Sequence, residues 1–151
     1  MRLSMWLSFS IIASLGAGVL VAQQPKTFKA RLSPVPIDIS MQATIAGSGS
    51  VVATLTGNKL AITGTFDGLR SPATIAQVHK GPVKGVRGPV VFDLTVAKGA
   101  EPTAGTLSGS VELTALQIAD LEKARLYVQL HSEKAPDGNL WGWLVLPESR
   151  R

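Results

Sequence analysis

The two histidines, His79 and His131, are the side chains in this sequence best suited to chemistry. Each lies in a segment that alternates apolar and polar residues, with a glutamine two positions earlier, Gln77 or Gln129. Residues two apart on a strand share one face, so each glutamine lies beside its histidine. If the two strands are neighbours, the four side chains form one polar patch, which we take as a candidate binding site.

Metal binding and hydrogen bonding are the two roles open to this patch. Imidazole nitrogens bind Zn or Cu, so His79 and His131 are the candidate metal ligands. A zinc site usually takes three or four protein ligands, and the chain has no cysteine that could complete the set. We therefore predict no cofactor and a structural hydrogen-bonding role. The alternative is a small His-based metalloprotein or oxidoreductase of the periplasm.

A second candidate site is the pair Trp141 and Trp143, which alternates with Leu140 and Leu144. If the leucines face the core, the two indoles point to the opposite face of the strand. An exposed aromatic pair there would engage a partner protein, a glycan or a second copy of the chain as a homodimer. The alternative is that a loop or the helix covers both indoles.

The rest of the sequence offers no catalytic arrangement. No spacing of serine, histidine and aspartate resembles a triad, and the aspartates fall in expected turns, on a strand surface and in a helix. Gly81, Gly85 and Gly88 do not connect a strand to a helix as a phosphate-binding loop does. We therefore predict a binding or structural module that is not an enzyme.

One stretch, residues 126–146, must position both candidate sites. Its first half alternates Leu126, Val128 and Leu130 with polar or aromatic residues, the period-2 pattern of a strand. Pro136-Asp137-Gly138 then predicts a turn, because proline presets φ and glycine accepts positive φ. The second half returns as a strand. We expect a β-hairpin whose Leu130 and Leu144 are buried.

The other elements follow from the same alternation and from turn residues. Gly57-Asn58 predicts a tight hairpin, and Thr114 with Gln117 predicts a capping box at the start of a helix. Closely spaced short strands favour an all-β fold, which we predict as an antiparallel Greek-key β-sandwich, immunoglobulin-like or superoxide-dismutase-like, with one short helix. The expected strands are residues 27–33, 50–56, 59–66, 73–79, 89–97 and 106–113, with an irregular strand at 37–45 and the helix at 115–124.

Three segments, in this order, resemble the CHRD domain of chordin and of many exported microbial proteins. They are IAQVHKGPVKGVRG with the strand PVVFDL after it, LTALQIADLEKARLYVQL, and HSEKAPDGNLWGWL. The family pattern has a HIH-G strand, a short helix, a YVNVHT strand and a return strand of the form P-G-E-I-R-G-Q-L. The opening FKARLSPVP followed by GSGS is similar as well, so the resemblance spans about residues 27–147.

The chain departs from the family pattern at several positions. Gln77 stands at the first histidine of the HIH pair, while the second histidine and that of the hairpin are retained as His79 and His131. The acid, arginine and glutamine of the return strand are replaced by Asn139, Trp141 and Trp143. The resemblance implies an extracytoplasmic module and supports fold and location more than a particular chemistry.

The first 22 residues predict a signal peptide. Arg2 precedes an uncharged, mostly apolar run, and Ala22 stands before Gln23-Gln24-Pro25, where we expect cleavage. A retained membrane anchor is the alternative. We therefore expect a CHRD-like domain over residues 23–151, periplasmic or secreted, without a membrane span after cleavage.

Composition limits the partners. The chain has no cysteine, which excludes disulfides and thiolate metal sites, and its net charge is +5. Basic residues are mostly scattered, with one local group at Lys80, Lys84 and Arg87. That charge either keeps the protein soluble or attracts it weakly to a polyanionic cell surface. Nucleic acid is not an expected partner, because basic and aromatic residues are not interleaved.

Overall fold

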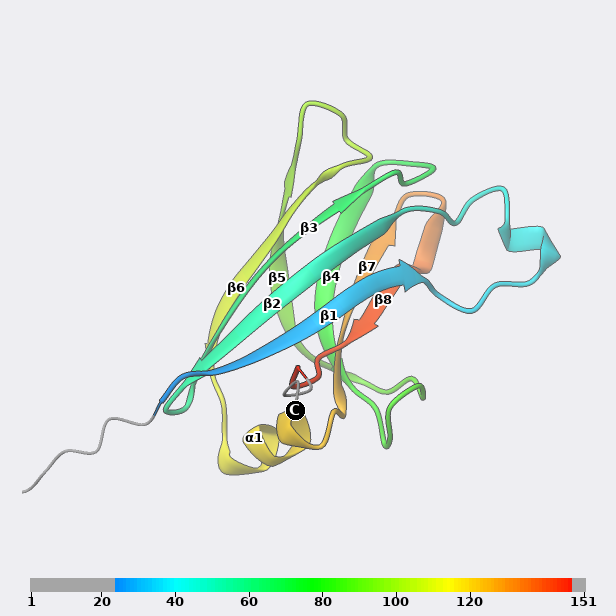
Figure 1. Ribbon diagram of the computed structural model, residues 1–151. Coiled ribbons are helices and arrows are strands. Elements are labelled where there is room, and N and C mark those ends of the chain that lie inside the picture. The colour runs from blue at the N-terminus through cyan, green and yellow to red at the C-terminus, as the bar shows by residue number, and fades with distance from the viewer. Residues whose placement is uncertain (1–23, 148–151) are drawn as a thin grey trace, which may run out of the picture.

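The structure is a computed structural model in which residues 24–147 are described (Figure 1). The predicted signal peptide, residues 1–22, lies outside the described residues. Within them the chain forms eight antiparallel strands, one α-helix and one short 3-10 helix. The strands are β1 Lys26–Pro34, β2 Ser48–Thr56, β3 Lys59–Asp67, β4 Ala73–Lys80, β5 Val90–Lys98, β6 Gly105–Glu112, β7 Leu126–Ser132 and β8 Ala135–Trp143.

The sheet closes into a barrel in the order β1-β2-β3-β6-β5-β4-β7-β8 (Figure 1). The prediction of an antiparallel all-β fold with one short α-helix is confirmed, but the predicted two-sheet Greek-key sandwich is replaced by this closed barrel. Alternation of apolar and polar residues is the same in both architectures, because each buries one face of every strand. The barrel closes because β1 bonds to both β2 and β8, while β5 bonds to both β6 and β4.

Aliphatic side chains from every strand fill the interior. Alternate residues of β1, Phe28, Ala30 and Leu32, are buried, as the period of a strand requires. Leu130 and Leu144 are both fully buried, as predicted from the alternation of the hairpin. The outward residues of β1 and β2 are exposed, so these strands have one dry and one wet face.

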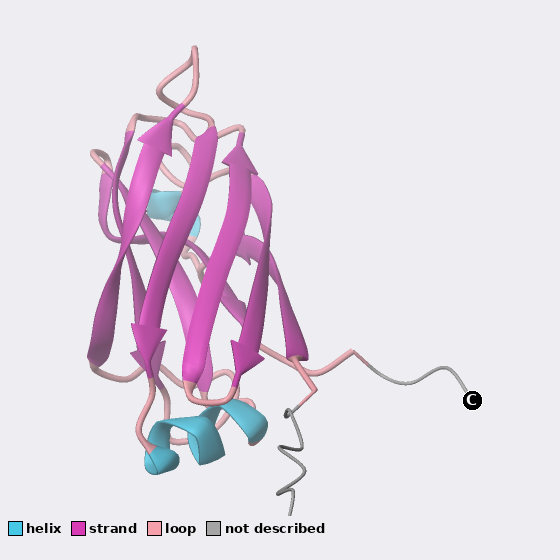
Figure 2. Cartoon of the chain, turned by 90° about the vertical axis from the view of Figure 1, so that its left-hand side faces the viewer, coloured by secondary structure: helices cyan, strands magenta, loops and turns pink. Residues whose placement is uncertain are grey.

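The helix α1, Ala115–Glu122, covers one end of the barrel (Figure 2). It begins with the predicted capping box, in which the Thr114 side chain accepts from the Gln117 N–H and the Gln117 side chain accepts from the Thr114 N–H. Asp120 fixes the helix to the end of β4 through Lys80, at 2.6 Å, and is also 3.4 Å from Arg125. The bond to Lys80 lowers the pKa of the Asp120 carboxyl.

Two local predictions were wrong. The segment 37–45 contains a 3-10 helix, Ile39–Met41, in place of an irregular strand, because the Asp38 side chain accepts from two backbone N–H groups and caps it. The β7–β8 hairpin turns at Glu133-Lys134, while Pro136-Asp137-Gly138 lies inside β8 as a bulge. The bulge contains a residue with positive φ, Gly138 at +127°, as several types of turn also do.

Candidate functional site

The predicted site residues gather on the outer face of β4, β7 and β8. Strands β4 and β7 are neighbours, with His79 opposite Tyr127 and Gln77 opposite Gln129. Strand β8 lies on the other side of β7, with Trp143 opposite Tyr127 and Trp141 opposite Gln129. The register therefore places side chains from three strands in one region. We call five of them the aromatic cluster: His79, Tyr127, His131, Trp141 and Trp143.

Tyr127 lies at the centre of the aromatic cluster. Its ring stacks on His79 with 5.0 Å between centroids, and it lies 4.5 Å from Trp143 and edge-on to Trp141 at 5.8 Å. The two indoles meet edge to face at 6.0 Å. Such pairs contribute about 0.5–1.5 kcal/mol each beyond the area they bury. Both indoles are half-buried, so they are part of the outer packing and also part of the surface.

The loop 81–89 folds back over this cluster. The Gly88 N–H donates to the Tyr127 hydroxyl at 3.1 Å, and the Gly81 N–H donates to the Arg125 carbonyl at 2.8 Å. Gly81 lets Trp143 approach, since a Cβ there would lie 2.6 Å from the indole. The loop covers Tyr127 and the β8 bulge contacts Gln129 and His131, so β7 is buried on both faces.

Each buried histidine is fixed by a backbone carbonyl. His79 Nδ1 lies 2.9 Å from the Gly88 oxygen and His131 Nδ1 lies 2.7 Å from the Pro136 oxygen, which belongs to the bulge. A carbonyl only accepts, so both Nδ1 atoms carry the proton and, in the neutral rings, both Nε2 atoms carry lone pairs. Burial lowers the pKa of His131, which favours its neutral form.

The two glutamines have different roles. Gln129 is buried and donates to the Asp137 carbonyl at 3.1 Å, with His131 Nε2 at 3.3 Å from the same nitrogen. Gln77 is half-buried and donates to Asp93 on β5, so its polar group turns away from the histidines. Two buried acceptors of the region, His79 Nε2 and Gln129 Oε1, have no donor among the described residues.

This donor set does not match a zinc site. The rings of His79 and His131 are 6.4 Å apart between centroids, and residues 24–147 contain no group of three or more His, Asp, Glu or Cys side chains that could hold a metal ion. Zinc sites in proteins use three or four protein ligands. The arrangement supplies two imidazole lone pairs and an amide oxygen, which suit hydrogen bonding.

An open groove of about 250 Å³ runs along the seam where β8 meets β1. We call it the seam groove. Trp141, Gly142 and Trp143 line it from β8, and alternate outward residues of β1 line it from the neighbouring strand. The full lining is Lys29, Arg31, Ser33, Lys84, Trp141, Gly142, Trp143 and Val145.

Arg87 connects the seam groove to a second hollow. Its guanidinium lies over the Trp141 ring at 5.8 Å from the centroid and donates to the Asp137 carbonyl at 3.0 Å. On the far side it lines a hollow of about 520 Å³ between the 3-10 helix segment and the bulge of β8. The cation–π contact orients both the guanidinium and the indole.

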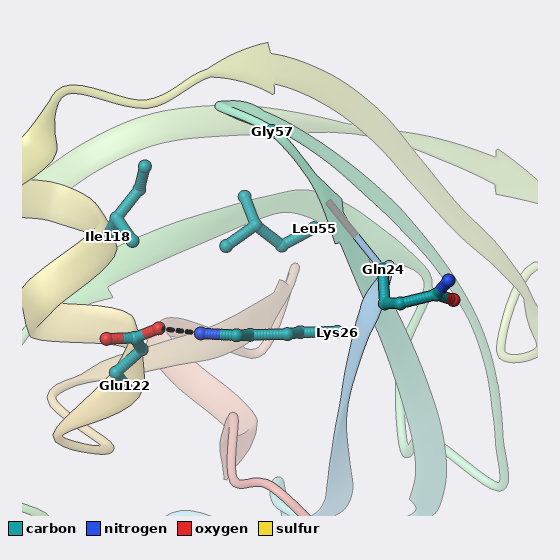
Figure 3. A pocket seen from close by; sticks show the side chains of 6 residues that line it. All are labelled: Gln24, Lys26, Leu55, Gly57, Ile118 and Glu122. Atoms are coloured by element: carbon teal, nitrogen blue, oxygen red, sulfur yellow. Dashed lines mark hydrogen bonds and ion pairs between the residues drawn. The ribbon is translucent and has the colours of Figure 1, made fainter. Parts of the chain in front are cut away.

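A third hollow, of about 380 Å³, lies beside α1 (Figure 3). Aliphatic Leu55 and Ile118 line it, together with Lys26 and Glu122, which form an ion pair (Figure 3). It contains no histidine and no aromatic ring, so nothing in its lining suggests catalysis. The surface with the most distinctive chemistry is therefore the aromatic cluster with its seam groove.

Comparison with known families identifies the chain. A family model described as the CHRD domain matches residues 28–144. The chain belongs to the CHRD family. Searches of curated proteins and of solved structures gave no match. CHRD domains are generally non-enzymatic and occur in extracellular or secreted proteins. No helix within residues 24–147 is long and apolar enough to cross a bilayer.

Four cations of this CHRD surface were not singled out from the sequence as site residues. Lys29 and Arg31 reach the seam groove only because β1 pairs with β8, more than 100 residues later in the chain. Lys84 and Arg87 were noted only as members of a basic group, whose third member, Lys80, is paired with Asp120. The sequence feature that could have indicated Lys84 and Arg87 as site residues is the glycine-rich loop that carries them directly after the strand of His79.

Proposed function

We propose that this CHRD protein is an exported, non-catalytic binding module whose ligand contacts the surface around Trp141 and Trp143. The supporting observation is that the two half-buried indoles are held in fixed positions by Tyr127 and by the loop 81–89, and line an open groove. A preorganised aromatic surface binds without a large cost of ordering side chains. The partner classes considered from the sequence were a protein, a glycan and a second copy.

The polar groups near the groove favour binding over catalysis. His79 and His131 each use Nδ1 in a bond to a backbone carbonyl, and no carboxylate lies within hydrogen-bond distance of either ring among the described residues. General acid–base catalysis needs a titratable group that reaches the substrate. Both rings are buried beneath the loop 81–89 and the β8 bulge, which keeps them from this role.

The export part of the proposal is supported by the sequence of residues 1–22. An arginine followed by an uncharged apolar run and a small residue before Gln23 is the composition of a secretory signal. A periplasmic or secreted location agrees with the places where CHRD domains occur. The absence of cysteine means that the domain folds there without disulfides.

Co-sedimentation of the purified protein with cell envelopes of its host tests the binding proposal. The wild-type protein should sediment with the envelopes in a saturable way, and Trp143→Leu should reduce that binding strongly. Phe92→Leu, which alters a half-buried aromatic residue that packs against the core from β5, three strands away from β8, is the control and should bind as wild type. Binding that is absent, or that is the same in Trp143→Leu and wild type, contradicts the proposed surface.

The second candidate function is a His-based metalloprotein. The two Nε2 lone pairs favour it, because metal-binding histidines commonly donate their other ring N–H to a carbonyl. The small donor set argues against it, so we expect no stoichiometric Zn or Cu. Metal analysis of untagged protein decides the matter: one tightly bound ion per chain, lost in His79→Ala or His131→Ala, would establish this candidate.

A further inference from the structure

The charged residues of the seam groove, together with its two indoles, indicate the chemical class of its ligand. Its two indoles are flanked from one side by Lys29 and Arg31 of β1 and from the other by Lys84 of the loop 81–89. None of its eight lining residues is acidic. Arg87, over Trp141, adds a fourth cation beside the groove.

These cations are available to a ligand. Among the described residues, ion pairs occupy Lys26, Lys80 and Arg125, and none occupies a cation of the groove. Lys29, Arg31 and Lys84 are all exposed. Charges of one sign gathered around an apolar surface create a local positive potential, which attracts an anionic ligand and orients it before contact.

We propose that the seam groove binds an acidic polysaccharide whose sugar rings carry carboxylates. This proposal rests on the proposed function, since it names the ligand class of the same surface. The C–H face of a pyranose ring is apolar and can be buried against Trp141 or Trp143. The guanidinium of Arg31 offers two parallel N–H donors to a carboxylate, and Lys29 and Lys84 supply point charges along the chain of sugars.

The same charges argue against a second copy of the chain. A two-fold symmetric contact places the same patch on both subunits, so Lys29, Arg31 and Lys84 of one copy would approach those of the other. Like charges brought together in an interface oppose association. The groove is also small. Its volume of about 250 Å³ suits one or two sugar rings better than the surface of a partner protein.

Titration with defined tetrasaccharides tests the proposal, with binding followed by calorimetry and tryptophan fluorescence. Tetragalacturonate carries carboxylates, and maltotetraose is the uncharged ligand of equal length. We expect saturable binding of tetragalacturonate at low salt, weakened at higher salt because the charges are screened. Maltotetraose should bind at least about tenfold more weakly, the factor that one charge-assisted contact contributes.

Charge variants provide the specific test, because exposed cations can be replaced without disturbing the fold. Arg31→Ala and Lys84→Ala should each weaken tetragalacturonate binding by about tenfold or more. Lys98→Ala, an exposed lysine at the end of β5 on the opposite side of the barrel, is the matched control and should bind as wild type. Thermal melts of all variants should coincide.

The outcomes separate this proposal from the one on which it rests. Envelope binding that depends on Trp143 but persists in excess tetragalacturonate leaves the binding module intact and overturns the polysaccharide ligand. Equal binding of both tetrasaccharides, or unchanged binding by Arg31→Ala and Lys84→Ala, also overturns the acidic class. Preference for vesicles of phosphatidylglycerol over tetragalacturonate would assign the surface to lipid, and a Trp143-dependent dimer in sedimentation would assign it to a second copy.

Discussion

At the level of single residues, His131 connects strand β7 to the bulge of β8. It is buried, its Nδ1 donates to Pro136 in the bulge, and burial lowers its pKa from the ordinary value of 6.5. The unfolded chain therefore binds a proton at His131 at higher pH than the folded chain does. Stability from this residue is complete above about pH 6.5 and is lost as the pH falls toward the lower folded value.

A pH series of denaturant unfolding tests this first prediction. Between pH 7.5 and 5 the wild-type free energy of unfolding should fall, by at most about 1.4 kcal/mol for each unit that separates the two pKa values. His131→Gln should be less stable at pH 7.5, because the bond to Pro136 is altered, but should show a flatter profile. The carboxyl of Asp120 titrates below 3.8 and lies outside this window. Parallel profiles for the two proteins would refute the assignment to His131.

Core residues of the hairpin give the second prediction. Leu130 and Leu144 are fully buried, so truncating either to Ala should cost about 2–5 kcal/mol, through lost transfer free energy and a cavity. Leu116→Ala is the matched control, because that residue of α1 is 79% exposed. It should change stability by less than about 0.5 kcal/mol. Losses under about 1 kcal/mol at both core positions would mean that the interior packing is wrongly described.

At the level of elements, the loop 81–89 determines the character of the outer face. It returns so close to β4 that a Cβ at Gly88 would lie 1.8 Å from the Lys80 carbonyl oxygen. Gly88→Ala should therefore push the loop away from Tyr127 and destabilise the protein by about 1–3 kcal/mol or more. Hydrogen exchange should quicken at Gly81, whose amide donates to the Arg125 carbonyl.

Gly99→Ala is the control for this third prediction. Its added Cβ would meet no atom closer than 3.3 Å, so the loop that contains it needs only a small adjustment. Unfolding and hydrogen exchange of the two variants can be compared directly. Equal stability of Gly88→Ala and Gly99→Ala, with unchanged exchange at Gly81, would mean that the loop is not fixed as described.

Most elements could be predicted from residues that are close together in the sequence. The covering of β7 could not, because it depends on contacts between residues far apart in the sequence. The Gly57-Asn58 turn and the Thr114–Gln117 capping box were found because each involves residues close in sequence. The covered outer face of β7 was missed, because the covering loop lies about 40 residues earlier and only the β4–β7 pairing brings it there. Pro136-Asp137-Gly138 predicts a turn by residue type, but the structure uses its positive-φ glycine in a bulge of β8.

The candidate site could also be predicted only in part from the sequence. His79, Gln129, His131 and the two tryptophans were predicted from type and spacing, and the structure brings them together on one face. Gln77 was predicted with them but donates to Asp93 instead. The cations of β1 could not be predicted, because nothing in a strand's sequence indicates which strand closes a barrel against it.

At the level of the whole molecule, the fourth prediction concerns export. The composition of residues 1–22 predicts cleavage before Gln23, so protein recovered from its host should begin near Gln23. Mass spectrometry of intact protein from periplasmic, culture and cytoplasmic fractions measures this. Full-length protein that begins at Met1 and stays in the cytoplasmic fraction would contradict the export half of the proposed function.

The seam between β8 and β1 joins the two ends of the described barrel, so the barrel closes only when both strands are present. Those are the last and first strands of the barrel, and their ladder consists of Ser33–Trp141 and Pro34–Leu140 with one further bridge from Lys29 to Val145. In a chain that is synthesised from its N-terminus, one edge of β1 stays unpaired until the residues of β8 have been made. The groove that we assign to the ligand spans this same junction, so it comes into existence only with the final closure. A chain that lacks β8 therefore lacks the groove proposed for the ligand, and binding at that groove would report the closure of the barrel.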